Sequence, residues 1–245
     1  MIFLTIDVEP LEYEYPREKA YSWIQSFDSF ISKTKIPCTL FITPDVFKKY
    51  QKTIKKWSVL HEIGLHIHPL YLGYENDYLN TYTSPIIREI IVKGMKEAKK
   101  YYHKEITSFR AARWMYHKDL PEILSKLGFT HDSSVFPNAY SKNKSQKIGN
   151  IIEISPSIWA PFPLKILYTF GLFSSGGFVP CDGLLKTRYH KMIYPTSKVI
   201  LPKHPLVFAC HSFNFEDIIF TQRFNDYLTY LQNKKQTFSK LSEVK

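Results

Sequence analysis

Residues 61–69 read HEIGLHIHP, an apolar segment that carries two histidines near its end and stops at a proline. In a β-strand, side chains two positions apart point to the same face, so His66 and His68 share one face. Pro69 has no backbone N–H to donate to a sheet, which ends the strand there. The segment therefore predicts a strand whose carboxyl end presents two imidazole rings.

Similar apolar runs occur on both sides of this segment. They are residues 2–6 (IFLTI), 38–43 (CTLFIT), 107–114 (TSFRAARW) and 206–211 (LVFACH). Stretches with apolar residues at helical spacing, such as 17–34 and 84–103, lie between these runs. Strands that alternate with helices indicate a parallel sheet. The chain has 245 residues, the length of one α/β barrel, so we expect a single domain over residues 1–245.

Polar residues with catalytic chemistry collect where the predicted strands end. They are Asp7 and Glu9 after the first strand, His66 and His68 after the third, Arg110 after the next, and His211 after the last. The carboxyl ends of parallel strands meet at one edge of a sheet or barrel, and the sites of α/β proteins lie there. We therefore expect these side chains to lie close together.

Two imidazoles and one carboxylate form a natural ligand set for a catalytic zinc ion, which keeps one position open for water. Asp7 and Glu9 are two residues apart and can point the same way. An acid pair at a strand end can instead form only a salt bridge, and an HxH pair can be two ordinary polar histidines. The combination of the two pairs is what favours a metal site.

The basic residues suggest further roles. An arginine is always charged and fork-shaped, so Arg110 can orient a carboxylate or hold substrate oxygens. Arg113 fits a surface salt bridge better than Arg110 does. His211 is followed by a serine, but the sequence contains no GxSxG motif of a serine nucleophile. His211 is therefore a better candidate for a general acid than for the base of a nucleophile.

Six segments, taken in order, resemble the polysaccharide deacetylase family, which has the NodB-homology fold. They are LTIDVEP, PCTLFIT, HEIGLHIHP, FRAARW, DSSVFP and VFACHSF, between residues 4 and 213. The HEIGLH and FRAARW segments are the specific ones. The resemblance implies an α/β fold of the distorted (β/α) barrel type. It also implies a divalent metal, usually zinc, held by one carboxylate and two histidines, and hydrolysis of an acetamide.

The resemblance also implies a role for each matching residue. Asp7 matches the catalytic base, Arg110 the arginine that orients it, and His211 the catalytic acid. Val8 stands where the family usually has its metal-binding aspartate, so Glu9 is the nearest substitute, and the reverse assignment of Asp7 and Glu9 stays open.

The second ligand histidine of the family also has no direct match. Leu70 stands at its usual position, and His68 is the obvious replacement because it shares a strand face with His66. The predicted metal ligands are therefore Glu9, His66 and His68. Near the cleft, Arg113, Trp114 and Asp132 are the predicted substrate-binding residues.

The charge balance limits the kinds of partner. Lysine and arginine number 33 and aspartate and glutamate 22, which gives a net charge of +11. That excess favours a phosphate-bearing substrate or peripheral contact with an anionic membrane surface. No compact basic motif occurs, so nucleic acid is not an expected partner. The sequence does not set the oligomeric state.

The remaining features concern location. Met1 leads directly into the first strand without a signal-peptide pattern, which predicts a cytoplasmic protein. The stretch 166–185 is apolar but interrupted by serines, glycines and a proline, and we expect a loop rather than a membrane span. The three cysteines form no CxxC pair, and we expect Cys38 and Cys210 to be buried thiols.

The sequence therefore predicts a metal-dependent hydrolase that removes N-acetyl groups from a sugar or from a lipid- or nucleotide-linked glycan. Two alternatives stay open. The first is a hydrolase of a cyclic or other amide, with or without a metal. The second is a catalytically degenerate carbohydrate-binding protein that uses the tyrosine-rich loop at 71–82.

Overall fold

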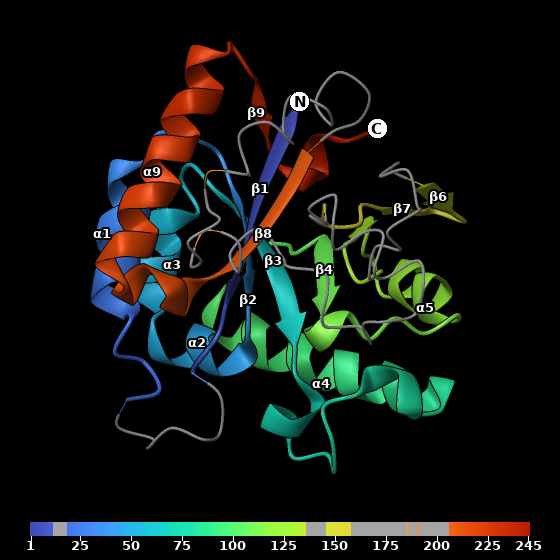
Figure 1. The fold of residues 1–245 in the computed structure, drawn as a ribbon. Coiled ribbons are helices and arrows are strands. Elements are labelled where there is room, and N and C mark those ends of the chain that lie inside the picture. The colour runs from blue at the N-terminus through green and yellow to red at the C-terminus, as the bar shows by residue number, and fades with distance from the viewer. Residues whose placement is uncertain (12–18, 136–145, 158–184, 186–190, 192–205) are drawn as a thin grey trace, which may run out of the picture.

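The computed structural model describes residues 1–11, 19–135, 146–157, 185, 191 and 206–245. Within these ranges one curled, mostly parallel sheet forms a half-barrel flanked by helices (Figure 1). The strand order is β6-β7-β5-β4-β3-β2-β1-β8, and β9 pairs with β1 beside this path. This is the distorted α/β barrel architecture that the sequence predicts.

The strand bounds follow the apolar runs of the sequence closely. The strands are β1 Ile2–Val8, β2 Thr39–Ile42, β3 Glu62–Ile67, β4 Ser108–Ala111, β5 His131–Asp132, β6 Gln146–Ile148, β7 Ile151–Glu153, β8 Leu206–His211 and β9 Phe238–Ser239. Among the described strands, only β6 and β7 pair antiparallel. The β3 and β4 arrows point to the lower half of Figure 1, which is the edge where the carboxyl ends of the strands lie.

The helices flank the sheet, with α1, α3 and α9 on one side and α5 near its β7 end (Figure 1). Their bounds are α1 Ile24–Lys33, α2 Pro44–Lys49, α3 Gln51–Trp57, α4 Ser84–Tyr101, α5 Leu120–Lys126 and α9 Ile218–Asn233. Helices α2, α4 and α5 carry a proline in the first turn, where its missing N–H costs nothing. Asp217 is the N-cap of helix α9, and its carboxylate accepts hydrogen bonds from the N–H groups of Ile219 and Phe220.

Aromatic rings fill the space between α1, α9 and the 3-10 turn at Ser212–Glu216. Phe215 of this turn stacks on Phe30 with ring centroids 4.3 Å apart and contacts Phe27 at 5.4 Å. Phe224 of α9 closes the cluster at 5.4 Å from Phe215. Because the turn directly follows β8, this cluster fixes the chain immediately after His211.

Several details differ from the sequence prediction. Helix α1 begins at Ile24 rather than near residue 17. Helix α9 ends at Asn233 because Lys235 takes a left-handed φ of 53°, and the chain then adds β9. Helix α3 and the β6–β7 hairpin were not expected. A turn at Gly149, with φ of 61°, makes this hairpin, and glycine adopts that conformation without strain.

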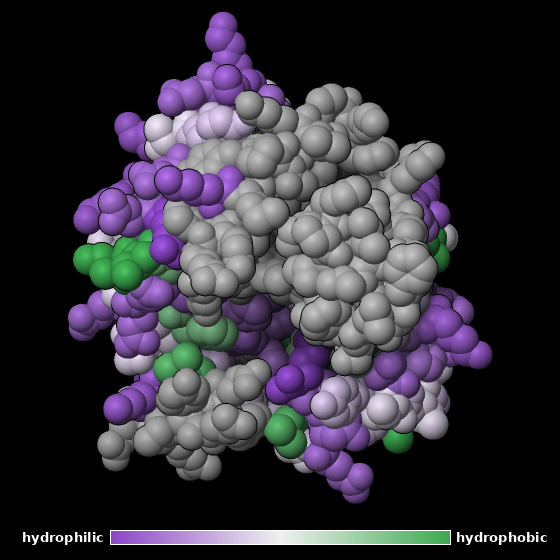
Figure 2. Space-filling view, in the orientation of Figure 1, coloured by the Kyte–Doolittle hydropathy of each residue, from purple (hydrophilic) through white to green (hydrophobic). Residues whose placement is uncertain are grey.

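The predictions about burial and membranes have mixed outcomes. Cys38 and Cys210 are buried, as expected, whereas Cys181 and residues 166–184 lie outside the described residues. Hydrophilic residues cover most of the described surface on the face in Figure 2. Among the described helices, none has the length and apolarity needed to cross a bilayer.

The sheet leaves no space for a side chain at Gly64 of β3. A Cβ there would lie 2.7 Å from Cδ1 of Phe41 and 3.1 Å from the carbonyl oxygen of Ser108. The Phe41 ring in turn faces the Arg110 guanidinium at 4.3 Å. We expect Gly64→Ala to lower the free energy of unfolding by about 1–3 kcal/mol through overpacking. Urea denaturation checks this, and an unchanged midpoint would contradict it.

Candidate active site

The sheet register brings distant parts of the chain to one edge. Asp7 of β1 pairs with His211 of β8, and His66 of β3 pairs with Arg110 of β4. Glu9 follows two residues after Asp7, just beyond the end of β1. All of these residues except His211 are almost fully buried, so the site is built into the carboxyl edge of the sheet.

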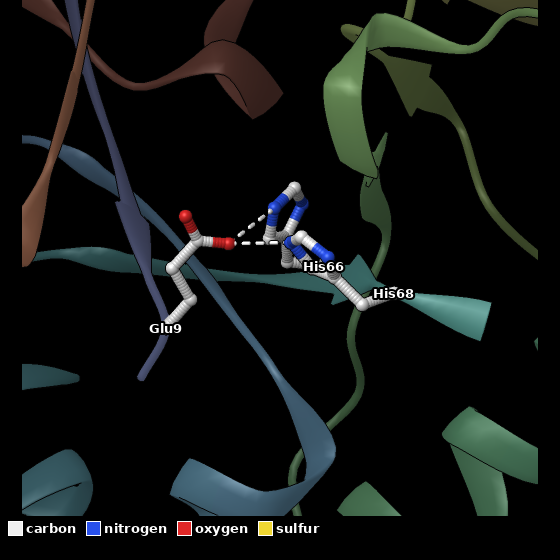
Figure 3. Close-up of side chains that lie close together, drawn as sticks. All are labelled: Glu9, His66 and His68. Carbon is white, nitrogen blue, oxygen red and sulfur yellow. Dashed lines mark hydrogen bonds and ion pairs between the residues drawn. The ribbon is translucent and has the colours of Figure 1, made fainter. Parts of the chain in front are cut away.

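Glu9, His66 and His68 converge on one point (Figure 3). Oε2 of Glu9 lies 3.2 Å from Nε2 of His66 and 2.5 Å from Nε2 of His68. One ligand atom from each residue can be chosen so that all three lie within 4.8 Å of one another. The other carboxylate oxygen of Glu9 lies 3.6 Å from Nε2 of His211.

The outer nitrogens of both histidines are held by oxygen acceptors. Nδ1 of His66 lies 2.9 Å from the carbonyl oxygen of Arg110. Nδ1 of His68 lies 2.6 Å from Oδ2 of Asp77. A carbonyl oxygen can only accept, so Nδ1 of His66 carries a hydrogen. A carbonyl or carboxylate behind each ligating imidazole is the usual arrangement at metal centres. The donor set therefore fits a divalent metal such as zinc.

The charges inside the cluster stabilise one another. Burial alone would raise the pKa of Glu9, but the charge of His68 and hydrogen bonds from both histidines hold it well below its usual range. Burial would likewise lower the pKa of His68, yet Glu9 and Asp77 raise it to about 10. In the absence of an ion, His68 therefore keeps a proton between two carboxylates. A metal ion at Nε2 would take the place of that proton.

Asp7 has a different partner, the side chain of Arg110. Nη1 of Arg110 donates to Oδ1 of Asp7 at 2.6 Å, and the Arg110 side chain is completely buried. Nη2 of Arg110 also donates to the hydroxyls of Thr5 and Ser133 at 2.8 Å. The guanidinium thus holds the Asp7 carboxylate in one orientation.

Arg113 and Trp114 occupy a strained turn directly after β4. Both residues have left-handed backbone angles, with φ of 54° and 51°, which cost about 1–2 kcal/mol each for residues other than glycine. Nε of Arg113 lies 3.2 Å from Oδ2 of Asp77. Arg113 keeps 41% of its side chain exposed, and Trp114 is half-buried. Their predicted contact with substrate stays a prediction.

Asp132, the third predicted substrate-binding residue, is buried. Its side chain is fully buried in β5, and the Ser134 hydroxyl donates to it. The parallel β5–β7 register sets Asp132 beside Glu153. The predicted contact of Asp132 with substrate stays a prediction.

The two buried carboxyls of Asp132 and Glu153 interact closely enough that one of them holds a proton. Burial and this neighbour raise the pKa of Glu153 well above its usual range, and burial raises the pKa of Asp132 to about 6. Asp132 is the better-stabilised anion because Ser134 and the backbone of Ser133 donate to it. Glu153 is thus the residue that keeps the proton near neutral pH.

This pair predicts a pH-dependent stability. Both pKa values are higher in the folded than in the unfolded protein, so the folded state binds more protons. Stability therefore falls as pH rises above about 4, through about 6 for Asp132 and to higher pH for Glu153. A rise in the Asp132 pKa from 3.8 to about 6 corresponds to roughly 3 kcal/mol. We expect Glu153→Gln, whose amide can donate at any pH, to flatten this loss in urea unfolding at pH 4 to 8. The exposed Glu122→Gln is the control, and parallel profiles for Glu153→Gln and the native protein would count against a shared proton.

Asp77 and Glu153 are the polar residues of this region that sequence reasoning missed. Asp77 lies in the loop after His68 and fits no periodic pattern, so nothing local signals that it turns back to the His68 ring. Glu153 reaches Asp132 only through the β5–β7 register. The position of Glu153 near a strand end is a weak signal, and it indicates a contact with Asp132 only once the pairing of β5 with β7 is known.

The likeness to known proteins rests on structure. No protein-family model and no curated protein matches the sequence. A protein of Mycobacterium smegmatis described as a polysaccharide deacetylase aligns over 100% of this chain and 94% of its own, with a TM-score of 0.61 and 14% identity. Puue allantoinase aligns over 98% of this chain and 86% of its own, with a TM-score of 0.64 and 12% identity.

A third similar structure is a pseudoenzyme. BA3943 of Bacillus anthracis, a CE4 family pseudoenzyme, aligns over 99% of this chain and 64% of its own, with a TM-score of 0.56 and 13% identity. The chain therefore has the NodB-like fold of the polysaccharide deacetylases. At these identities the likeness establishes the fold, and the chemistry depends on the residues at the carboxyl edge.

Proposed function

We propose that the protein is a metal-dependent carbohydrate N-deacetylase. One observation carries this proposal: Glu9, His66 and His68 converge beside Asp7 with its buried arginine and beside His211. A three-residue donor set flanked by an acid and a base is what hydrolysis of an unactivated amide needs. The fold of polysaccharide deacetylases supports the same reaction.

The proposed ligands of the metal are Nε2 of His66, Nε2 of His68 and a carboxylate oxygen of Glu9. The chemistry supplied at this centre by a bound divalent ion is polarisation of the acetamide carbonyl and activation of a water molecule. Arg110 and Asp77 hold the two imidazoles from behind. Asp7 is the less suitable ligand because Arg110 already engages its carboxylate at 2.6 Å.

The proton transfers belong to Asp7 and His211. Asp7 accepts a proton from the attacking water, and Arg110 keeps the carboxylate oriented toward that proton. The water oxygen bonds to the acetyl carbon, the carbon–nitrogen bond breaks, and acetate leaves. His211 donates a proton from Nε2 to the departing nitrogen, so the sugar amine leaves neutral. His211 is 28% exposed, which lets it meet a substrate entering from solvent.

The proposed substrate is an N-acetylated sugar that bears phosphate, such as a nucleotide- or lipid-linked glycan. The net charge of +11 supports this choice, because a basic protein attracts anionic substrates over long range. Cytoplasmic location and contact with a membrane surface belong to the same proposal.

Metal content and acetate release together test the function. The purified protein should hold one equivalent of zinc, and the His66→Ala and His68→Ala variants should lose it. Acetate should be released from a nucleotide-linked N-acetyl sugar faster than from the neutral oligosaccharide. A metal-free protein with full activity contradicts the mechanism, and glycan binding without turnover indicates a degenerate binding protein.

A second candidate is hydrolysis of a cyclic amide. The similarity to Puue allantoinase favours it, since that protein aligns over nearly the whole chain. Ring opening of a small cyclic amide that survives chelators, with no acetate from any sugar, would identify this activity. The same assay mixture therefore separates the two candidates.

A further inference from the structure

The imidazole of His68 lies between two carboxylates. Its Nε2 faces Glu9 at 2.5 Å, and its Nδ1 faces Asp77 at 2.6 Å. All three side chains are about 93% buried. Since Nε2 is the atom that a metal would use, the hydrogen of a neutral ring belongs on Nδ1, and Asp77 is its acceptor.

Asp77 is itself held from two other directions. Its Oδ1 accepts from the backbone N–H of Leu70 at 3.4 Å, and its Oδ2 lies 3.2 Å from Nε of Arg113. Arg113 reaches that position from the left-handed turn after β4. A strained turn that delivers a side chain to a buried carboxylate is a feature of functional sites.

The loop that carries Asp77 contacts His68 a second time. The ring of Tyr71 stacks on the imidazole, with centroids 4.6 Å apart and planes tilted by 25°. Tyr71 belongs to the 3-10 turn Pro69–Leu72, which directly follows His68. One end of the loop therefore covers the imidazole face, and the other supports its outer nitrogen.

We propose that Asp77 and Arg113 are positioning residues that couple the metal centre to the loop at 69–82. Asp77 fixes the orientation and tautomer of His68, and Arg113 fixes Asp77. Metal binding at Nε2 strengthens the Nδ1 contact with Asp77 and so orders the loop, and an ordered loop favours metal in return. This inference rests on the proposed metal centre. It assigns Asp77 and Arg113 as the residues that support His68, the histidine that replaces the usual ligand.

The first test measures zinc affinity by competition with a chelating indicator. We expect Asp77→Ala to weaken zinc binding by about 10–100-fold and Arg113→Ala to weaken it less, because the Asp77–His68 contact remains. The matched control is Asp28→Ala. Asp28 likewise accepts from a ring N–H, that of Trp57 at 2.8 Å, and from a basic side chain, Lys56 at 3.2 Å. It touches none of the site residues and should leave zinc affinity unchanged.

Two further measurements separate positioning from general stability. In the Asp77→Ala background, the added Arg113→Ala change should have no further effect on zinc affinity, because Arg113 acts through Asp77. Zinc should slow amide hydrogen exchange of residues 69–82 in the native protein and do so much less in Asp77→Ala. A general loss of fold would change exchange throughout the sheet instead.

The outcomes are distinguishable from failure of the proposed function. If Asp77→Ala has the zinc affinity and the loop protection of the native protein, the coupling is wrong. Loss of zinc in His68→Ala would in that case still support the proposed metal centre. If Arg113→Ala weakens zinc binding equally in the native protein and in Asp77→Ala, Arg113 does not act through Asp77. If the native protein binds no zinc, or binds it no more tightly than the His68→Ala variant does, the proposed metal centre is wrong. The inference then fails with it.

Discussion

Asp7→Asn is expected to lower kcat for acetate release by about 10²–10⁴-fold, the usual contribution of a positioned acid–base group, and to leave zinc bound. The amide keeps an oxygen that accepts from Arg110, so the local structure survives. What it loses is the ability to take a proton from water. Acetate release and zinc content, measured on the same preparation, check both parts.

The same variant decides between the two carboxylates of β1. If Asp7 were the ligand and Glu9 the base, Asp7→Asn would lose zinc and Glu9→Gln would keep it. The distances favour the opposite result, because Oε2 of Glu9 lies within 3.2 Å of both histidine nitrogens. Asp28→Asn serves as the control for a general effect of removing a carboxylate. Full activity in Asp7→Asn would exclude Asp7 as the base.

Arg110→Met is expected to lower the free energy of unfolding by about 3–5 kcal/mol, the cost of leaving one partner of a buried ion pair alone. Met fills much of the same volume but leaves Asp7 as an unpaired buried charge. It also leaves the hydroxyls of Thr5 and Ser133 without their donor. The measurement is urea unfolding followed by circular dichroism.

The double variant Asp7→Asn with Arg110→Met identifies the cause of this loss. It should be more stable than Arg110→Met alone, because the neutral amide removes the stranded charge. Arg110→Lys keeps the charge without the fork and should lose less than Arg110→Met. If the double variant were the less stable one, the ion pair would not account for the effect.

The strand ends could be predicted from the sequence because apolar runs and their polar tips are local patterns. The residues at those tips, Asp7, Glu9, His66, Arg110 and His211, do meet at one edge. The sequence left the assignment within the Asp7–Glu9 pair open, since the contacts of each carboxylate depend on where Arg110 and the histidines lie across the sheet. Asp77 and the burial of Asp132 were equally out of reach, because a loop that folds back and the β5–β7 register leave no periodic signal.

The three residues of the proposed metal site all lie within residues 1–68, at the carboxyl ends of strands β1 and β3, with β2 between these strands. Arg110 comes 103 positions after Asp7, and His211 is later still. During synthesis, which proceeds from the N-terminus, the proposed ligand set is therefore available well before Arg110 and His211 complete the proposed acid–base groups. A zinc ion bound at that stage would link the ends of β1 and β3 across β2. It would thereby stabilise the pairing of the first three strands before the rest of the sheet forms.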